Sequence, residues 1–345
     1  MDLKTQIKKL KHYFLNVILI WLAILFYNTN SYCKNFLREE TQITLIYLAI
    51  VYTIFGLIYY LWKSEDKIHD TKGTIIFRAL KRTLKEGDNY LKAFNSKVKK
   101  PLPKIEKHEK NTLLFLLVKI FYLPIMLNFF FANYSSIRNQ IPNLLDLNSI
   151  FTMTSFNILI FPFLLTAIFL VDTLWFSFGY AIETKSLKNT VRSVEPTVFG
   201  WVVALACYPP FNGIFTKYVN WYANDYVVFY NDFLTVIIRI IIILLLMIYV
   251  GATLALGAKC SNLTNRGIVS KWPYSIVRHP AYISKNLAWW LTIMPVLSIT
   301  ATLSMATWSL IYHLRTITEE RHLIKDLDYI KYCKKVKYRY IPGIY

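Results

Sequence analysis

Long apolar runs alternate with polar, mostly basic segments along the chain. A helix that spans a membrane needs roughly 20 mostly apolar residues, and several of these runs approach or exceed that length. The pattern therefore predicts an all-α, polytopic integral membrane protein with about eight membrane-spanning segments. These are expected near Tyr13–Asn28, Ile43–Trp62, Leu113–Phe131, Phe151–Phe176, Val198–Phe215, Phe233–Leu256, Ile283–Val296 and Ser298–Leu314.

The last two predicted spans form a closely spaced pair. Ile283–Val296 and Ser298–Leu314 are each short, and Pro295 lies near the bend between them. We expect a tight helical hairpin that either just crosses the membrane or re-enters it.

The distribution of charge predicts the orientation. Net charge is +20, and residues 63–111 alone carry fourteen Lys and Arg, whereas the loops after the first, third and fifth spans carry few. The positive-inside rule places both termini, the 63–111 loop and everything after Leu256 in the cytosol, as for a protein of the bacterial inner membrane. Within the basic loop, Thr74–Phe94 is typical of a helix lying on the membrane surface, interrupted near Gly87.

Composition excludes several other classes of protein. The chain is 55% hydrophobic and 17% aromatic, which is typical of polytopic membrane proteins. The basic residues lie beside the spans, so we expect no nucleic acid partner. Ten glycines without a G-x-G-x-x-G motif disfavour a Rossmann-type nucleotide site. Four scattered cysteines predict neither a disulfide nor a metal site; they are Cys33, Cys207, Cys260 and Cys333.

Three ionisable residues fall inside predicted spans: Lys119, Asp172 and Arg239. Such groups are costly in a membrane unless they are paired or hydrated. Asp172 or Lys119 could belong to a headgroup or substrate site. Alternatively they form an interhelical pair, and Arg239 extends its charged end to the membrane surface.

Charged and aromatic groups recur at fixed separations in the last part of the chain. The run Arg278-His279-Pro280-Ala281-Tyr282 precedes the predicted hairpin, and Glu319-Glu320 follows it. Pro280 removes His279 from a helix and can begin the next one at its first turn. A hairpin would return the carboxylates to the arginine and histidine. Acids, arginines and flat aromatic rings together suit a zwitterionic cofactor with a sulfonium, a ribose and an adenine.

Over about its last 85 residues the chain resembles the isoprenylcysteine carboxyl methyltransferase family, which includes phospholipid N-methyltransferase relatives. The matching pattern is Pro-Tyr, Arg-His-Pro-x-Tyr, a helical hairpin, Arg-x-x-x-Glu-Glu-x-x-Leu, Tyr-x-x-Tyr and Arg-x-Ile-Pro. Here it comprises Pro273, Tyr274, Arg278, His279, Pro280, Tyr282, Arg315, Glu319, Glu320, Leu323, Tyr329, Tyr332, Arg339, Ile341 and Pro342. Two departures are Trp272, where the family often has glycine, and Ser284-Lys285-Asn286, where a small residue is common.

The resemblance implies an integral membrane methyltransferase that uses S-adenosylmethionine and a membrane lipid or lipid-linked acceptor. Residues 1–256 would be N-terminal membrane helices, and 257–345 the catalytic region with its active site in the cytosol. Arg339 and Glu320 are the expected catalytic residues, for O-methylation of a carboxylate like that of isoprenylcysteine. The expected cofactor-binding residues are Pro273, Tyr274, Arg278, His279, Pro280, Tyr282, Arg315, Glu319, Glu320, Tyr329 and Tyr332.

Two other functions stay open at this point. Membrane reductases of the steroid and sterol kind are similar at their C-terminus, with an Arg-His-Pro-x-Tyr run, and use NADPH; the Glu319-Glu320 pair favours the methyltransferase. A transporter or scaffold is the second alternative, because Asp172 and Lys119 lie within spans. The sequence identifies neither the chemical class of the acceptor nor the oligomeric state, and it does not separate the role of Glu319 from that of Glu320.

Overall fold

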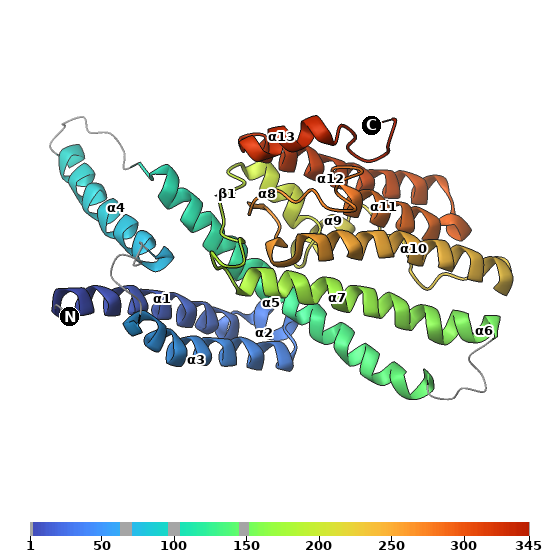
Figure 1. Cartoon of the computed structure of the whole chain (residues 1–345), viewed down its shortest axis with the longest axis horizontal. Coiled ribbons are helices and arrows are strands. Elements are labelled where there is room, and N and C mark those ends of the chain that lie inside the picture. The colour runs from blue at the N-terminus through green and yellow to red at the C-terminus, as the bar shows by residue number, and fades with distance from the viewer. Residues whose placement is uncertain (1–2, 63–70, 96–103, 145–151, 345) are drawn as a thin grey trace. The chain divides into compact units, whose positions relative to one another are not determined.

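The structure is a computed structural model that describes residues 3–62, 71–95, 104–144 and 152–344. It is mostly helical, with a single two-stranded sheet in the described part of the chain (Figure 1). Five described helices are long and apolar enough to cross a membrane, as predicted for five of the eight spans. They are Thr5–Thr29, Glu39–Trp62, Lys107–Leu144, Met153–Ala181 and Asp232–Lys259.

The chain divides into two compact units, residues 1–124 and 125–345. In the first unit, α1 packs against α3 and α4. The Tyr13 hydroxyl of α1 donates a hydrogen bond of 2.6 Å to the Thr53 carbonyl of α3. The elements of this unit are α1 (Leu3–Thr29), α2 (Ser31–Phe36), α3 (Glu39–Trp62), α4 (Lys72–Asn95) and the beginning of α5 (Lys107–Leu144).

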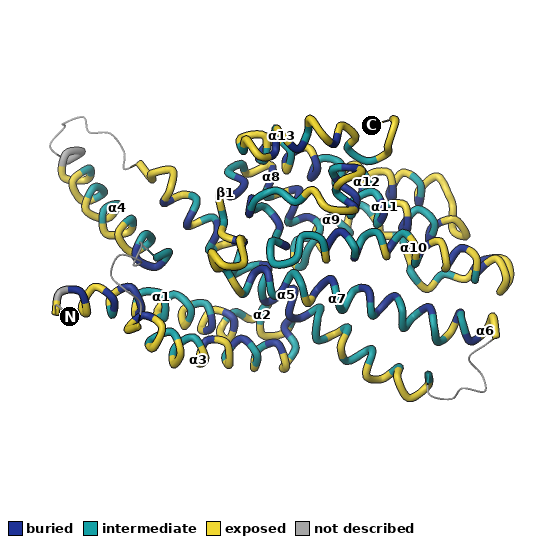
Figure 2. Tube along the Cα trace, in the orientation of Figure 1, coloured by how far each residue is buried: buried dark blue, intermediate teal, exposed yellow. Residues whose placement is uncertain are grey.

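Large apolar side chains lie exposed along α1 and α3, as the yellow stretches of these helices show in Figure 2. Ile18 and Leu22 of α1 and Ile54 and Phe55 of α3 belong to this set. Soluble monomers rarely expose contiguous apolar surface on this scale. The two helices are therefore suited to contact lipid.

Helix α4 is continuous, so the predicted interruption at Gly87 is wrong. Glycine costs only about 1 kcal/mol within a helix, which the rest of α4 outweighs. Its apolar side chains Phe77, Leu80, Leu84 and Leu91 are exposed, as a membrane-surface helix requires. The remainder of the basic loop, 63–70 and 96–103, lies outside the described residues.

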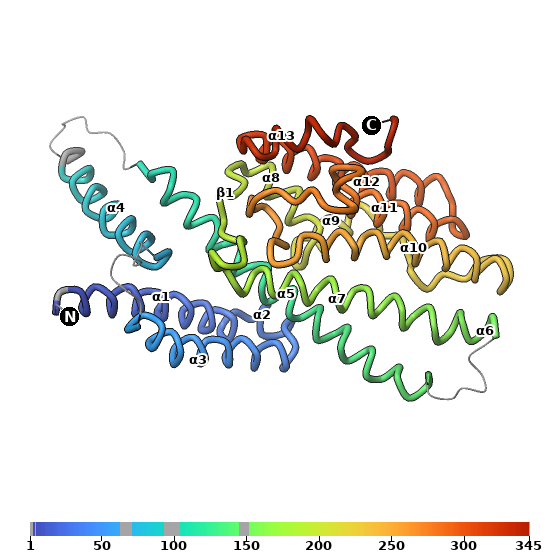
Figure 3. Tube along the Cα trace, in the orientation of Figure 1, coloured from blue at the N-terminus to red at the C-terminus, as the bar shows by residue number. Residues whose placement is uncertain are grey.

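The second unit holds the rest of the chain, which Figure 3 follows from green to red. Its core lies where α10 packs against α7 and α11, around Phe161, Leu165, Ile242 and Leu246. The Asn231 side chain caps the N-terminus of α10 by accepting a hydrogen bond from the Leu234 N–H. The elements are α6 (Met153–Ser155), the π-helix η3 (Phe156–Ile160), α7 (Phe161–Ala181), β1 (Ser193–Val194), α8 (Val198–Leu205), α9 (Phe211–Thr216), α10 (Asp232–Leu256), η4 (Gly257–Lys259), β2 (Thr264–Asn265), α11 (Pro280–Thr292), η5 (Met294–Val296), α12 (Ile299–Leu323) and α13 (Leu327–Lys335).

The predicted span Val198–Phe215 is not one helix. Helix α8 ends at Leu205, and α9 begins at Phe211. Pro209 and Pro210 lie between them, and proline interrupts a helix because it lacks the backbone N–H and clashes with the preceding turn. Neither piece has the length of a span by itself.

A short antiparallel sheet brings two polar loops together. Ser193 pairs with Asn265, and Val194 pairs with Thr264. Gly179 at the end of α7 permits this arrangement, because a Cβ there would lie 2.1 Å from the Cys260 carbonyl oxygen. Arg192 and Asn265 each donate a hydrogen bond of 2.8 Å to Asp326, so the two loops lie beside the C-terminal segment.

Candidate functional site

A cavity of about 440 Å³ in the second unit gathers residues from motifs that are far apart in the sequence. Side chains of α5, α7, α8, α10, α11 and α12 and of the 260–267 loop line it. Of the predicted site, its lining includes Tyr274, Arg278, His279, Tyr282, Arg315 and Glu319. The remaining predicted residues lie outside the lining; they are Pro273, Pro280, Glu320, Tyr329, Tyr332 and Arg339.

The Arg-His-Pro run is held by the C-terminal segment. The Arg278 N–H donates to the Tyr338 carbonyl at 3.0 Å, and the His279 N–H donates to the Arg339 carbonyl at 3.0 Å. Pro280 is the first residue of α11, where its missing N–H costs nothing. These bonds present both side chains at the beginning of α11, as the sequence predicts.

Glu320 joins three cationic or donor groups and is only 14% exposed. Arg278 Nε donates to its Oε1 at 2.8 Å, and His279 Nε2 lies 3.1 Å from the same atom. Arg339 donates to its Oε2 at 3.0 and 2.7 Å. Burial raises the pKa of the Glu320 carboxyl, but the hydrogen bonds from His279 and Arg339 and the nearby charges lower that pKa by more, to well below its ordinary value. Glu320 is therefore an anion that ties together three segments of the chain.

Glu319 has different surroundings from its neighbour. Its side chain is exposed and lines the cavity, and its Oε2 accepts a hydrogen bond of 2.8 Å from the Tyr282 hydroxyl. The Tyr282 ring stacks on the His279 ring, with centroids 5.5 Å apart and planes at 14°. A carboxylate has about four acceptor positions, so Glu319 retains capacity for a ligand.

Arg315 lies within an aromatic enclosure. Its guanidinium donates to the Asn262 side-chain oxygen. Its central carbon lies 5.4 Å from the Tyr282 ring centroid, 5.6 Å from that of Tyr208 and 5.9 Å from that of Tyr312. Stacking on rings suits the flat, weakly hydrated guanidinium. Asn262 carries no signal of this role in the sequence, and tertiary folding makes it the partner of this arginine.

Two tyrosines of α13 contact the cavity-lining residue Tyr274 without lining the cavity themselves. Tyr329 and Tyr332 are buried with Val336, packed against Tyr274 and Leu323. The Tyr332 hydroxyl donates to the Tyr274 carbonyl at 2.7 Å. The Tyr274 side chain, in turn, lines the cavity.

Trp272, which precedes Pro273, departs from the family pattern. Its ring lies against Gly251 of α10, where a Cβ would be 2.8 Å from the ring. The tryptophan at this position is therefore accommodated by a glycine on the neighbouring helix.

Glu195 and His322 also line the cavity, although we predicted no ligand role for either. Arg321 donates to Glu195 Oε1 at 2.9 Å, and His322 Nε2 lies 2.8 Å from Ser193 Oγ. Burial lowers the pKa of the His322 imidazole, which favours the neutral ring. The one signal for Glu195 in the sequence is its place directly before Pro196, ahead of α8.

The ionisable residues inside spans differ in their surroundings. Asp172 of α7 lines the cavity and accepts hydrogen bonds of 2.6 Å from both Tyr249 and Thr253. Arg239 is 4% exposed and donates to three backbone carbonyls, of Asn157, Tyr226 and Val227. Arg239 therefore has a structural role, but the expected extension of its charged end to the membrane surface is wrong, because the guanidinium is buried against these carbonyls. Lys119 lies in the first unit and is half-buried.

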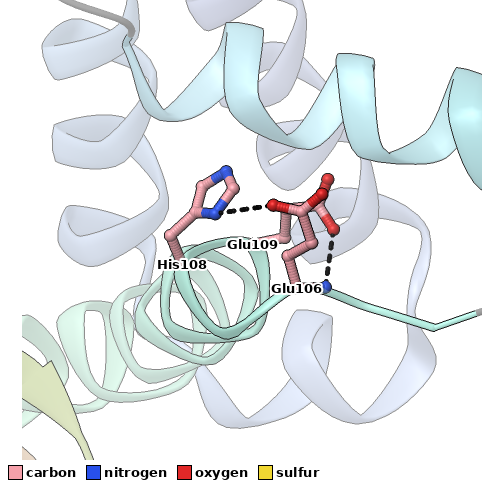
Figure 4. Close-up of side chains that lie close together, drawn as sticks. All are labelled: Glu106, His108 and Glu109. Carbon is pink, nitrogen blue, oxygen red and sulfur yellow. Dashed lines mark hydrogen bonds and ion pairs between the residues drawn. The ribbon is translucent and has the colours of Figure 1, made fainter.

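A second cluster lies at the beginning of α5, in the first unit. Glu106, His108 and Glu109 have ligand atoms within 4.8 Å of one another (Figure 4). Arg82 of α4 pairs with both carboxylates, and Glu109 Oε2 also accepts a hydrogen bond from the Glu106 N–H. The cluster therefore joins α4 to α5, and its acidic oxygens are already engaged by an arginine.

The cavity thus combines an exposed carboxylate, an arginine on aromatic rings, tyrosine ring faces and a buried acid. It can hold a ligand that carries both charges and a flat ring system. No protein-family model, no curated protein and no solved structure matches the chain.

Proposed function

We propose that the cavity binds S-adenosylmethionine, and that the protein is an integral membrane methyltransferase acting on a lipid or lipid-linked acceptor. One observation carries this proposal: the Arg-His-Pro-x-Tyr run and the Arg315–Glu319 segment contribute side chains to the same cavity. Its volume of about 440 Å³ falls within the roughly 300–1,000 Å³ of small-molecule sites.

The donor set of the cavity fits the proposed cofactor. Glu319 suits an ammonium or the hydroxyls of a ribose, because its carboxylate is exposed at the cavity and only partly occupied by Tyr282. Arg315 suits a carboxylate end. The faces of Tyr274, Tyr282 and Tyr312 suit an adenine ring.

Other motif residues position the site without contacting the ligand. Glu320 holds Arg278, His279 and Arg339, so it fixes the beginning of α11 relative to α12. In this proposal Glu320 and Arg339 are positioning residues, in place of the catalytic roles that the family resemblance implies. Catalysis then depends chiefly on how well the cavity orients the two reactants.

When bound, S-adenosylmethionine supplies a methyl group on a sulfonium, and transfer to a carboxylate oxygen forms a C–O bond as the C–S bond breaks, with the electron pair kept by sulfur. A carboxylate acceptor is already ionised at neutral pH and needs no base. Glu319 or His322 would take up a proton only if the acceptor were an amine. Methylation of a carboxylate oxygen therefore requires no proton transfer to Glu319 or His322.

We also propose a membrane arrangement. Helices α11 and α12, joined through η5, would form the tight hairpin. Eight spans would require α8–α9, α11 and α12 to enter the membrane together with the five long helices. Both termini, the 63–111 segment and the polar end of the cavity would face the cytosol, as the positive-inside rule predicts.

This orientation can be tested with single cysteines in a cysteine-free background. A cysteine in place of Tyr218, which is 85% exposed, should react with an impermeant maleimide in intact cells. A cysteine in place of exposed Lys335 should react only after lysis. The reverse pattern would overturn the arrangement.

Cofactor binding is the direct test of the function. Calorimetry on the detergent-purified protein should detect S-adenosylhomocysteine binding in the micromolar range, at roughly −8 kcal/mol. Glu319→Gln should weaken it by about 1.5–3 kcal/mol, roughly tenfold to more than a hundredfold, because a charge-assisted contact is lost.

Glu39→Gln is the matched control, since Glu39 is an exposed acid in the first unit. Its affinity for S-adenosylhomocysteine should equal that of the parent. Binding of NADPH in place of S-adenosylhomocysteine would identify a reductase and end the methyltransferase proposal. Equal affinities in parent and Glu319→Gln would remove this carboxylate from the site.

A further inference from the structure

Lys285 lines the cavity from α11, one turn beyond Tyr282. Its Nζ lies 4.7 Å from the ring centroid of Tyr249, and 5.3 Å from those of Phe169 and Trp289. The three rings come from α10, α7 and α11, so tertiary packing builds the enclosure. Cation–π attraction to the rings stabilises an ammonium that has given up part of its hydration.

The N–H donors of this ammonium have no hydrogen-bond or ion-pair partner within the described residues. Asp172 and Asp225 are near enough to interact electrostatically with the ammonium, but among the described residues neither forms an ion pair with it. Each oxygen of Asp172 instead accepts one hydrogen bond, Oδ1 from Thr253 and Oδ2 from Tyr249. Aromatic rings hold the cation in place without using up its capacity to donate.

The other strong cations of the cavity are already engaged. Arg278 donates to Glu320 and to the Val336 and Lys337 carbonyls. Arg315 donates to Asn262, and in the proposed function its remaining donors bind the carboxylate of S-adenosylmethionine. An oxyanion that enters the cavity would therefore meet Lys285 as the cation with open donors, in a setting where a charge contact is stronger than in water.

We infer that Lys285 binds the oxyanion of the lipid acceptor. The ligand class is a lipid headgroup carboxylate or phosphate, with its chain against the rings of Phe169 and Trp289. This inference rests on the proposed function in one respect, since it takes the bound oxyanion to be the methyl acceptor. Lys285 would hold that oxyanion one helical turn from Tyr282, whose hydroxyl donates to Glu319. The anion-binding role itself follows from the lysine and its rings.

Native mass spectrometry of the full chain in detergent can measure this role with three probes that carry the same chain. They are oleate, oleoyl lysophosphatidate and the neutral oleamide. The parent should bind an anionic probe at least tenfold more tightly than oleamide, as expected for one charge-assisted contact. Preference for oleate would indicate a carboxylate acceptor, and preference for lysophosphatidate a phosphate headgroup.

Lys285→Gln should abolish the preference, and Lys285→Arg should retain part of it. Lys271→Gln, at an exposed lysine outside the cavity lining, is the matched control and should bind as the parent does. Equal affinities of the parent for oleate and oleamide, or a preference that survives in Lys285→Gln, would overturn the inference.

S-adenosylhomocysteine binding to the same preparations separates this inference from the proposed function. Retained binding in Lys285→Gln shows that the cavity is intact in the variant. If no preparation binds S-adenosylhomocysteine while the lysine-dependent preference persists, the methyltransferase proposal fails and the anion site stands. If S-adenosylhomocysteine binds but the preference for anionic probes does not depend on Lys285, the anion-binding inference fails and the cofactor site stands.

Discussion

Replacing Glu320 by Gln should lower the free energy of unfolding by about 2–3 kcal/mol, because the change leaves a partly buried cluster of positive groups without its anion. The carboxylate accepts from Arg278 and Arg339 and contacts His279, and its side chain is only 14% exposed. A neutral amide retains one acceptor oxygen and removes the charge. Unfolding by dodecyl sulfate in mixed micelles would measure the difference.

The effect should depend on pH in a defined direction. The folded protein holds the pKa of Glu320 well below the ordinary glutamate value of 4.5. A depressed pKa contributes stability that is present above the unfolded pKa and is lost as pH falls through the folded one. The difference between parent and Glu320→Gln should therefore be constant from about pH 5 to 8 and shrink in more acidic solution.

Glu319→Gln is the matched control, since it alters the next residue of the same helix. It should change stability little, because Glu319 is exposed and has one hydrogen bond from Tyr282. The two variants thus separate positioning from ligand binding. Equal stability of Glu320→Gln and the parent at pH 7 would contradict the role of Glu320 as the anchor of this cluster.

Arg239→Met should lower the free energy of unfolding by roughly 3–5 kcal/mol, more than is expected for Glu320→Gln. The guanidinium donates at 2.6 Å to the Asn157 carbonyl and at 3.1 and 3.2 Å to those of Tyr226 and Val227. It also lies 4.6 Å from the Phe161 ring centroid. Methionine fills similar space but leaves these carbonyls without their donor in an apolar setting.

The same unfolding measurement applies, with Arg138→Met as the control at an exposed arginine of α5. That variant should unfold as the parent does. Arg239→Lys should recover only part of the loss, because an ammonium lacks the planar fork that reaches three acceptors. If Arg239→Met unfolds like the parent, Arg239 does not hold the π-helix and the 226–227 loop.

Much of the fold follows from local pattern. A run such as Phe233–Leu256 predicts a spanning helix because its length and apolarity leave the backbone no other partner in a membrane. Pro280 likewise predicts the beginning of α11 from its fixed φ and missing N–H. The prediction of one span at Val198–Phe215 was wrong. This segment is apolar through most of its length, but it is divided at Pro209 and Pro210.

The candidate site was predictable only as a set of residues. The sequence determined by itself which acids, arginines and tyrosines recur near the predicted hairpin, because motif spacing is a property of the chain. It could not separate Glu319 from Glu320, since adjacent residues of a helix point about 100° apart and the neighbours of each come from other segments. The structure directs Glu320 to Arg278 and Arg339, and Glu319 to the cavity.

The sequence by itself therefore determined the mostly helical fold, its long apolar helices and the residue types of the candidate site, through hydrophobicity and periodicity that act locally. Only the tertiary structure decided which charges are satisfied. Asp172 and Lys285 are more than a hundred positions apart, yet packing of α7, α10 and α11 gives the acid two hydroxyl partners and the ammonium three aromatic rings. Long-range contacts of this kind depend on how helices pack, which local sequence pattern does not encode.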